Sequence, residues 1–154
     1  MKGSILYTNF DNETNISTVT KQTKYGTFTC SVKVHSDDFD IMNEYDGYHF
    51  AEMKCDIAAY REKAQYMKQR AIGIEHAYNV LFDSCNENDP VMEKLWRQVN
   101  VAYWNYESAL HTYQILKESY PALIQNILMQ RRELRAKIEK RRERLKEIIE
   151  NTEN

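Results

Sequence analysis

The chain has 154 residues and a formal net charge of −2, which predicts one domain and excludes a protein that binds polyanions over its whole surface. Only 4 glycines and 2 prolines occur beside 29% charged residues, a composition that favours long helices. Aromatic residues make up 12% of the chain, which argues against a disordered protein.

The first 46 residues predict a small antiparallel sheet that ends in an acidic turn. β-Branched residues are frequent over 16–20 and 27–34, and the second stretch alternates apolar and polar residues with the period of a half-buried strand. Gly26 supplies a turn between the two stretches, and residues 4–8 are a candidate third strand. Because a two-stranded hairpin is marginally stable in water, we expect this sheet to pack on a helix or on a second copy of itself.

Acidic residues gather after the predicted strands. Residues 37–56 carry seven acidic side chains and a single lysine. The spacing after Asp38 departs at Met42 from that of a calcium-binding loop, so we predict no metal site. The acids are interpreted as turn formers and as favourable charges at a helix start. Used as a binding surface, this acidic face comprises Asp37, Asp38, Asp40, Glu44 and Asp46.

From Phe50 onward the apolar residues follow a heptad pattern, in which steps of three and four alternate. The first set of a/d positions is Phe50, Met53, Ile57, Tyr60, Ala64, Met67, Ala71, Ile74, Tyr78 and Leu81. A polar stretch at 83–90 ends in Pro90, and the second set then follows: Met92, Leu95, Val99, Ala102, Tyr106, Ala109, Tyr113, Leu116 and Tyr120. The short connector predicts an antiparallel helical hairpin over residues 47–120.

Pro121 and two successive steps of four predict that the helix changes partner or direction there. Residues 121–154 are expected to form a basic amphipathic helix, and residues 130–148 carry nine basic and four acidic side chains. Its a/d positions are Ile124, Ile127, Arg131, Leu134, Ile138, Arg141, Leu145 and Ile148. Since we expect no helix of the same chain beside residues 121–150, this stripe predicts a homodimer or a higher homo-oligomer.

Arginines at a/d positions 131 and 141 need an explanation, because burying an unpaired charge is costly. Three arrangements remain open. The helix packs on acidic residues of the head or of another protomer, it forms a coiled coil whose register the polar residues fix, or it holds an external anion. As a binding surface, the basic helix comprises Arg131, Arg132, Arg135, Arg141, Arg142 and Arg144.

The sequence predicts a protein that is not an enzyme and that binds no cofactor. It contains no phosphate-binding glycine loop, no zinc-protease motif and no paired-cysteine motif. His49 and Cys55 are six positions apart and so lie on different faces of a helix. An odd count of three cysteines and a start without a signal-peptide core predict a cytoplasmic protein with free thiols. No stretch is long enough and apolar enough for a membrane span.

Residues 26–57 are similar to small accessory proteins of phages of Gram-positive bacteria. The features that carry the resemblance are the strand ending in Val34-His35, the Asp37–Asp40 cluster, and Gly47 before Phe50-Ala51-Glu52. The resemblance implies a protein that acts in the cytoplasm of a bacterial host. It also implies an inhibitor, anti-CRISPR-like or otherwise anti-defence, that works by binding a host protein. It brings no active-site residues.

The overall prediction is an α+β, mostly α, protein in three segments: the sheet head at 1–46, the helical hairpin at 47–120 and the basic helix at 121–154. Opposite charge poles and the absence of a catalytic motif favour a protein-binding module, whose acidic face mimics nucleic-acid phosphates or whose basic helix docks on an acidic surface. One alternative is a nucleic-acid-binding protein that uses the basic helix. Another is a protein that sequesters a small nucleotide signal at an oligomer interface.

Overall fold

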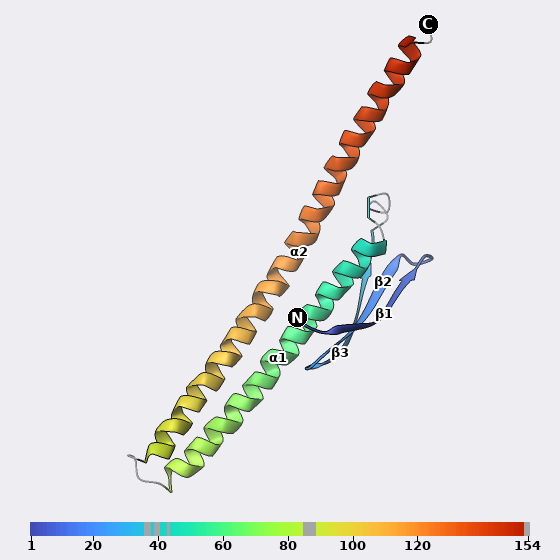
Figure 1. The fold of residues 1–154 in the computed structure, drawn as a ribbon. Helices are drawn as coiled ribbons and strands as arrows, with labels where there is room; N and C mark the ends of the chain where they lie inside the picture. Colours follow the sequence, from blue (N-terminus) through green and yellow to red (C-terminus); the bar gives the residue numbers. More distant parts are fainter. Residues whose placement is uncertain (36–37, 39–40, 43, 85–88, 153–154) are drawn as a thin grey trace.

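A computed structural model describes residues 1–35, 38, 41–42, 44–84 and 89–152. Its elements are strands β1 (Ser4–Asp11), β2 (Ile16–Thr23) and β3 (Gly26–Lys33), followed by helices α1 (Glu44–Phe82) and α2 (Pro90–Thr152). The sheet covers one side of α1 and α2 runs antiparallel along the other, then continues beyond the start of α1 (Figure 1). The predicted fold class, a small antiparallel sheet followed by a long helical hairpin, is confirmed.

The sheet is an antiparallel meander in the order β1-β2-β3, and it includes the third strand that the sequence suggested. Asn15, with a φ of 54°, and Gly26, with a φ of 141°, adopt the left-handed backbone conformations of the two turns. The residues of β2 alternate between buried and half-buried up to Lys21. One face of β2 therefore packs on α1, while the hydroxyl groups of Thr18 and Thr20 bond to hydroxyls of β3 on the other face.

Small residues let the sheet lie close to α1. Gly47, Ala51, Cys55 and Ala59 recur every fourth residue along one face of the helix, and all four are buried. Ala51 and Cys55 form the core of this contact with Val19 of β2, and the Cys55 thiol lies 3.4 Å from the Val19 carbonyl oxygen. The sheet thus uses a face of α1 that is separate from its heptad a/d positions.

A buried ion cluster joins the same two elements. Lys21 of β2 is only 3% exposed, and its Nζ lies 2.7 Å from Glu52 and 2.9 Å from Asp56 of α1. Burial by itself would lower the pKa of Lys21, but the bonds to Glu52 and Asp56 outweigh it and raise the pKa. The charged form of Lys21 is therefore stable inside the contact between sheet and helix.

The helical hairpin packs through the predicted heptad positions. Every a/d residue of the two predicted sets is buried or half-buried except Leu81, at the end of α1. Two tyrosines of α2, one of them at an a/d position, bond through their hydroxyl groups to polar partners on α1. Tyr103 donates to the Glu75 carboxylate, and Tyr120 donates to the Phe50 carbonyl oxygen at 3.2 Å. At the start of α2, the Asp89 side chain caps the helix by accepting from the Val91 N–H.

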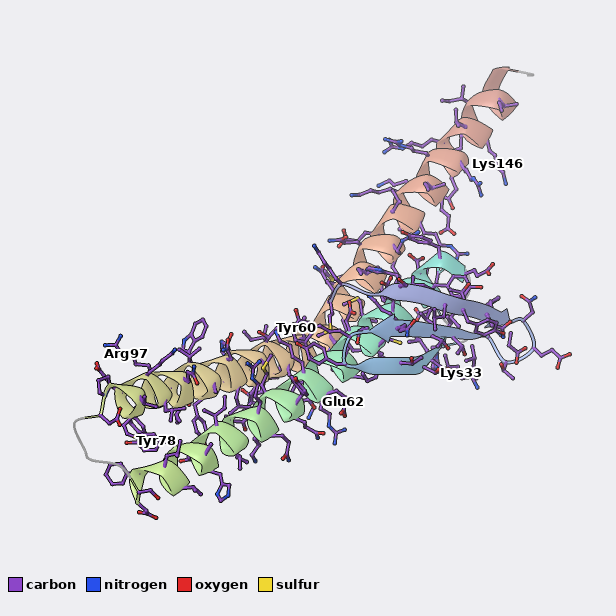
Figure 2. All side chains as sticks on the ribbon, turned by 60° about the horizontal axis from the view of Figure 1, so that its bottom comes forward. Lys33, Tyr60, Glu62, Tyr78, Arg97 and Lys146 are labelled. Atoms are coloured by element: carbon purple, nitrogen blue, oxygen red, sulfur yellow. The ribbon has the colours of Figure 1, made fainter. Side chains whose placement is uncertain are left out.

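The sequence predicted a change of partner or direction near Pro121, and Figure 2 shows the axis of α2 bending between the part that runs along α1 and the part beyond the sheet. α2 runs without interruption from Pro90 to Thr152, and Pro121 lies on its exposed side, where water can bond the carbonyl group that the missing N–H leaves unpaired. Because α1 begins at Glu44, α2 still has neighbours after Pro121, and Leu128 is buried. Only residues 133–149, which are all exposed, extend past these contacts, and we call them the C-terminal extension.

Gly47 offers a test of the contact between sheet and helix. A Cβ atom at Gly47 would lie 2.0 Å from the Ser17 Oγ and 2.8 Å from its Cβ, so rotation of Ser17 does not relieve the clash. We expect Gly47→Ala to lower the free energy of unfolding by about 1–3 kcal/mol, measured by urea denaturation. Gly73→Ala is the matched control, because a Cβ there meets no atom within 4 Å. It should raise stability by roughly 0.5–1 kcal/mol, and equal effects of the two variants would contradict the packing.

Candidate functional site

The C-terminal extension is exposed along its whole length and carries large apolar side chains. Leu134, Ile138 and Leu145 are 55%, 43% and 58% exposed, and they lie at the a/d positions of the heptad pattern. The extension spans about 25 Å at ~1.5 Å per residue. It projects beyond both the sheet and the start of α1 (Figures 1 and 2). An apolar helix stripe of this length in water marks an association site.

Basic residues border this stripe on both sides. At 100° per residue, Arg135 and Arg142 follow one edge, and Lys137 and Arg144 follow the other. Arg141 occupies an a/d position within the stripe itself. The acidic residues of the extension lie on the remaining face: Glu133, Glu139, Glu143 and Glu147. The extension therefore presents a hydrophobic stripe framed by positive charge.

Two arginines before the extension tie α2 to the head. The Arg131 guanidinium lies 2.7 Å from the Asp46 carboxylate in the first turn of α1, and the Arg132 guanidinium lies 2.6 Å from Asp38. The two carboxylates are about nine-tenths buried, with side chains 10% and 11% exposed. Charge-assisted bonds to buried acids are stronger than ordinary surface ion pairs. We call Arg131 and Arg132, together with their two acids, the arginine clamp. It marks the point beyond which α2 extends past the head and α1.

The clamp joins parts of the two surfaces that the sequence proposed as separate binding sites. Of the predicted acidic face, Asp38 and Asp46 are bound to α2, and exposed Glu44 accepts a hydrogen bond from the Tyr48 hydroxyl. Asp37 and Asp40 lie outside the described residues. Of the predicted basic helix, Arg131 and Arg132 are engaged in the clamp, and Arg135 pairs with Glu139 at 3.0 Å. Arg141, Arg142 and Arg144 are exposed on the extension.

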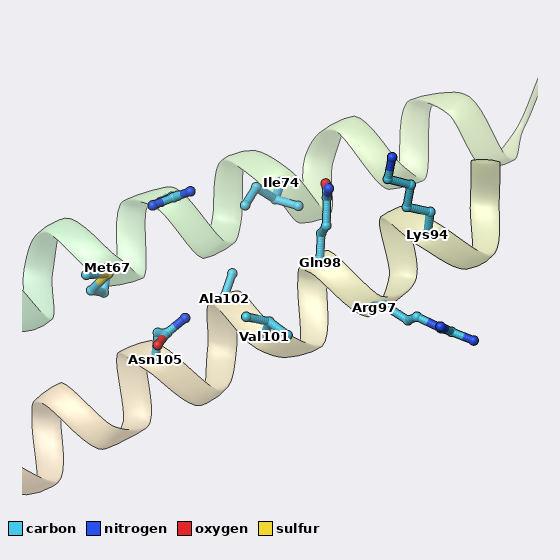
Figure 3. A pocket seen from close by; sticks show the side chains of 9 residues that line it. Met67, Ile74, Lys94, Arg97, Gln98, Val101, Ala102 and Asn105 are labelled. Carbon is cyan, nitrogen blue, oxygen red and sulfur yellow. The ribbon is translucent and has the colours of Figure 1, made fainter.

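A groove of about 470 Å³ lies between α1 and α2, near the end of the hairpin. Met67, Ile74 and Ala102 give it an apolar floor (Figure 3). Arg70 and Lys94 also line it, but no aromatic side chain is among the described residues that do so. Arg97 lines the groove as well, but its guanidinium extends away from it in Figure 3 and pairs with Glu93 at 2.6 Å. Among the described residues, the groove therefore offers a nucleotide the cations of Arg70 and Lys94, beside the paired Arg97, but no ring on which its base could stack.

Cys55 does not have the surroundings of a reactive thiol. Burial raises its pKa to about 12, and His49, six positions before it in the sequence, lies at the exposed surface. Burial also raises the pKa of Tyr120 to about 12. Among the described residues, no group of three or more His, Cys, Asp or Glu side chains is placed to hold a metal ion. Neither helix contains, within its described part, an apolar stretch that could cross a membrane.

No protein-family model, curated protein or solved structure matches this chain.

The arginine clamp can be tested by removing one partner. Arg131→Met keeps the length of the side chain but leaves the Asp46 carboxylate without its Arg131 partner, and we expect a loss of about 1–3 kcal/mol in unfolding free energy. That loss corresponds to a fall of several degrees in Tm, because about 1 kcal/mol shifts the Tm of a chain of this size by ~2–4 °C. Arg142→Met, which makes the same change on the extension, should leave Tm within about 1 °C. Equal Tm values for the two variants would refute the clamp.

The raised pKa of the Cys55 thiol predicts that the protein loses stability at alkaline pH. Between its ordinary pKa of 9.0 and its folded pKa of about 12, the unfolded chain releases the thiol proton while the folded chain retains it. Stability is therefore constant with respect to this group below about pH 9 and falls as the pH rises further. Cys55→Ala should make the decline of Tm above pH 9 shallower. Iodoacetamide at pH 8.5 should modify Cys55 only in denaturant, and rapid modification of the native protein would contradict this burial.

Proposed function

We propose that this protein is a non-enzymatic binding module that holds a target protein on its C-terminal extension. The observation that carries the proposal is the exposed stripe of Leu134, Ile138 and Leu145 on a helix already anchored by the hairpin. Because α2 is continuous, the extension needs no new helix nucleation before it binds. A partner would gain apolar burial at a low cost in conformational entropy.

The charge on the extension favours a different protein over a second copy of this chain. In a parallel pair of extensions Lys137 would face Arg142 of the other copy, and in an antiparallel pair each basic edge would face itself. Like charges across these positions oppose association. The charge pattern therefore favours a complex with an acidic protein over the homodimer that the sequence predicted.

From the resemblance of residues 26–57 to phage accessory proteins, we further propose that the target is a bacterial defence effector and that binding inhibits it. The bacterial cytoplasm is then the place of action. A nucleic acid is the second candidate ligand, supported by the basic edges of the extension. The pairing of Arg135 with Glu139 and the acidic back of the helix reduce its attraction for phosphates.

The test is capture of partners from bacterial lysate by the tagged full chain, with and without nuclease. We expect a protein that remains bound after nuclease treatment, that is lost with Leu134→Ser/Leu145→Ser, and that is retained with the matched control Ala136→Ser/Glu143→Ser on the opposite face of the helix. Circular dichroism should show equal helix content in all three proteins.

Two outcomes of this capture experiment would overturn the proposal. A protein partner that both double variants retain would place the binding surface elsewhere on the molecule. Partners that vanish with nuclease would instead identify the extension as a nucleic-acid-binding helix, and binding should then weaken steeply with added salt.

A further inference from the structure

Building on the proposed function, we infer that the extension binds an acidic amphipathic helix, with a carboxylate of that helix placed opposite Arg141. The partner helix lies along the apolar stripe of α2, where it continues the line of α1 past Glu44. It completes a two-helix coiled coil whose first part is the intramolecular hairpin. Its acidic residues flank its own apolar stripe.

The chain itself shows how an arginine at an a/d position of α2 is accommodated. Arg131 lies at such a position, and its partner is Asp46, an acidic residue of the antiparallel helix that faces it. Asp46 is about nine-tenths buried in this contact. Arg141 occupies the next arginine-bearing position of the same heptad series, beyond the end of α1. A facing helix with an acid at that level satisfies Arg141 as Asp46 satisfies Arg131.

The charged residues on either side of the stripe indicate which charges the partner helix carries beside its own apolar residues. In a coiled coil the e and g positions flank the a/d positions and set partner choice through their charges. On the extension the last e position holds Ile149, and the other e and g positions hold Arg135, Arg142, Lys137 and Arg144. All four are basic, whereas Glu133, Glu139, Glu143 and Glu147 occupy positions that a coiled coil leaves in solvent. The charge pattern thus selects a helix with glutamate or aspartate at its own e and g positions.

Other occupants fit the same surface less well. A nucleic acid would pair with the basic edges but would leave Leu134, Ile138 and Leu145 in water. An anionic membrane would cover these residues, but it would also place Arg141 in the middle of the inserted face. Only an acidic helix offers both apolar contact and a charge opposite Arg141.

The probe for this inference is a synthetic three-heptad peptide with leucine at its a/d positions, glutamate at e and g, and one aspartate at the a/d position that faces Arg141. We expect it to bind the full chain, as measured by fluorescence anisotropy. The same peptide with lysine at e and g should bind at least 10-fold more weakly. Arg141→Glu should weaken binding of the acidic peptide more than 10-fold. Lys140→Glu, the same charge change off the stripe, should weaken it less than about 5-fold.

A charge-swap peptide separates the Arg141 contact from general attraction. When lysine replaces the facing aspartate, the peptide should bind Arg141→Glu more tightly than it binds the native chain. Equal losses for Arg141→Glu and Lys140→Glu, with no recovery by the swapped peptide, would overturn the inference. So would tighter binding to duplex DNA or to phosphatidylserine vesicles than to the acidic peptide, or self-association of the chain at the concentrations used.

Failure of this inference remains distinct from failure of the proposed function. If the lysate experiment yields a protein whose capture depends on Leu134 and Leu145 but the acidic peptide does not bind, the extension is a docking site for a surface of another kind. If neither partner nor peptide depends on these residues, both proposals fall.

Discussion

The antiparallel packing of α1 against α2 is the contact on which the rest of the structure depends. α1 has 39 residues and α2 has 63, so the two helices cannot cover one another along their whole length. The sheet adds a second layer to α1 through a separate face of small residues and leaves the extra length of α2 uncovered. The difference in helix length therefore creates the extension, and the arginine clamp fixes where it begins.

Periodicity along the sequence predicted the elements well and their ends less well. The heptad positions of the hairpin and the alternation of β2 and β3 follow from which side chains leave water, so burial in the structure confirms them. The face of Gly47, Ala51, Cys55 and Ala59 was missed because its residues are small and alternate along the sequence with those of the heptad pattern. Pro121 was expected to mark a change of partner or direction, and α2 keeps its neighbours past this residue because a proline on the solvent side does not end a helix.

Partnerships between distant residues were the part that sequence reasoning left open. Arg131 and Asp46 are separated by 85 positions, and the pairing of the basic helix with the acidic head was one of three arrangements that composition allowed. The structure places Arg131 and Arg132 against the head and thereby removes Asp38 and Asp46 from the surface open to a partner. The extension stays exposed, and Arg141 occupies in it the same kind of heptad position as Arg131 but without α1 beside it. The repeated heptad pattern gives the intramolecular contact and the proposed intermolecular one the same physical basis.

Amide hydrogen exchange along α2, read by mass spectrometry, tests most directly whether this helix is uncovered beyond the clamp. In the free protein we expect strong protection over 92–131 and much faster exchange over 133–149, because a helix without tertiary contacts opens more readily. When a target binds, slow amide exchange should extend along α2 through residue 149. Uniform protection along α2 in the free protein would mean that the extension is already covered, and it would contradict the proposal that this surface awaits a partner.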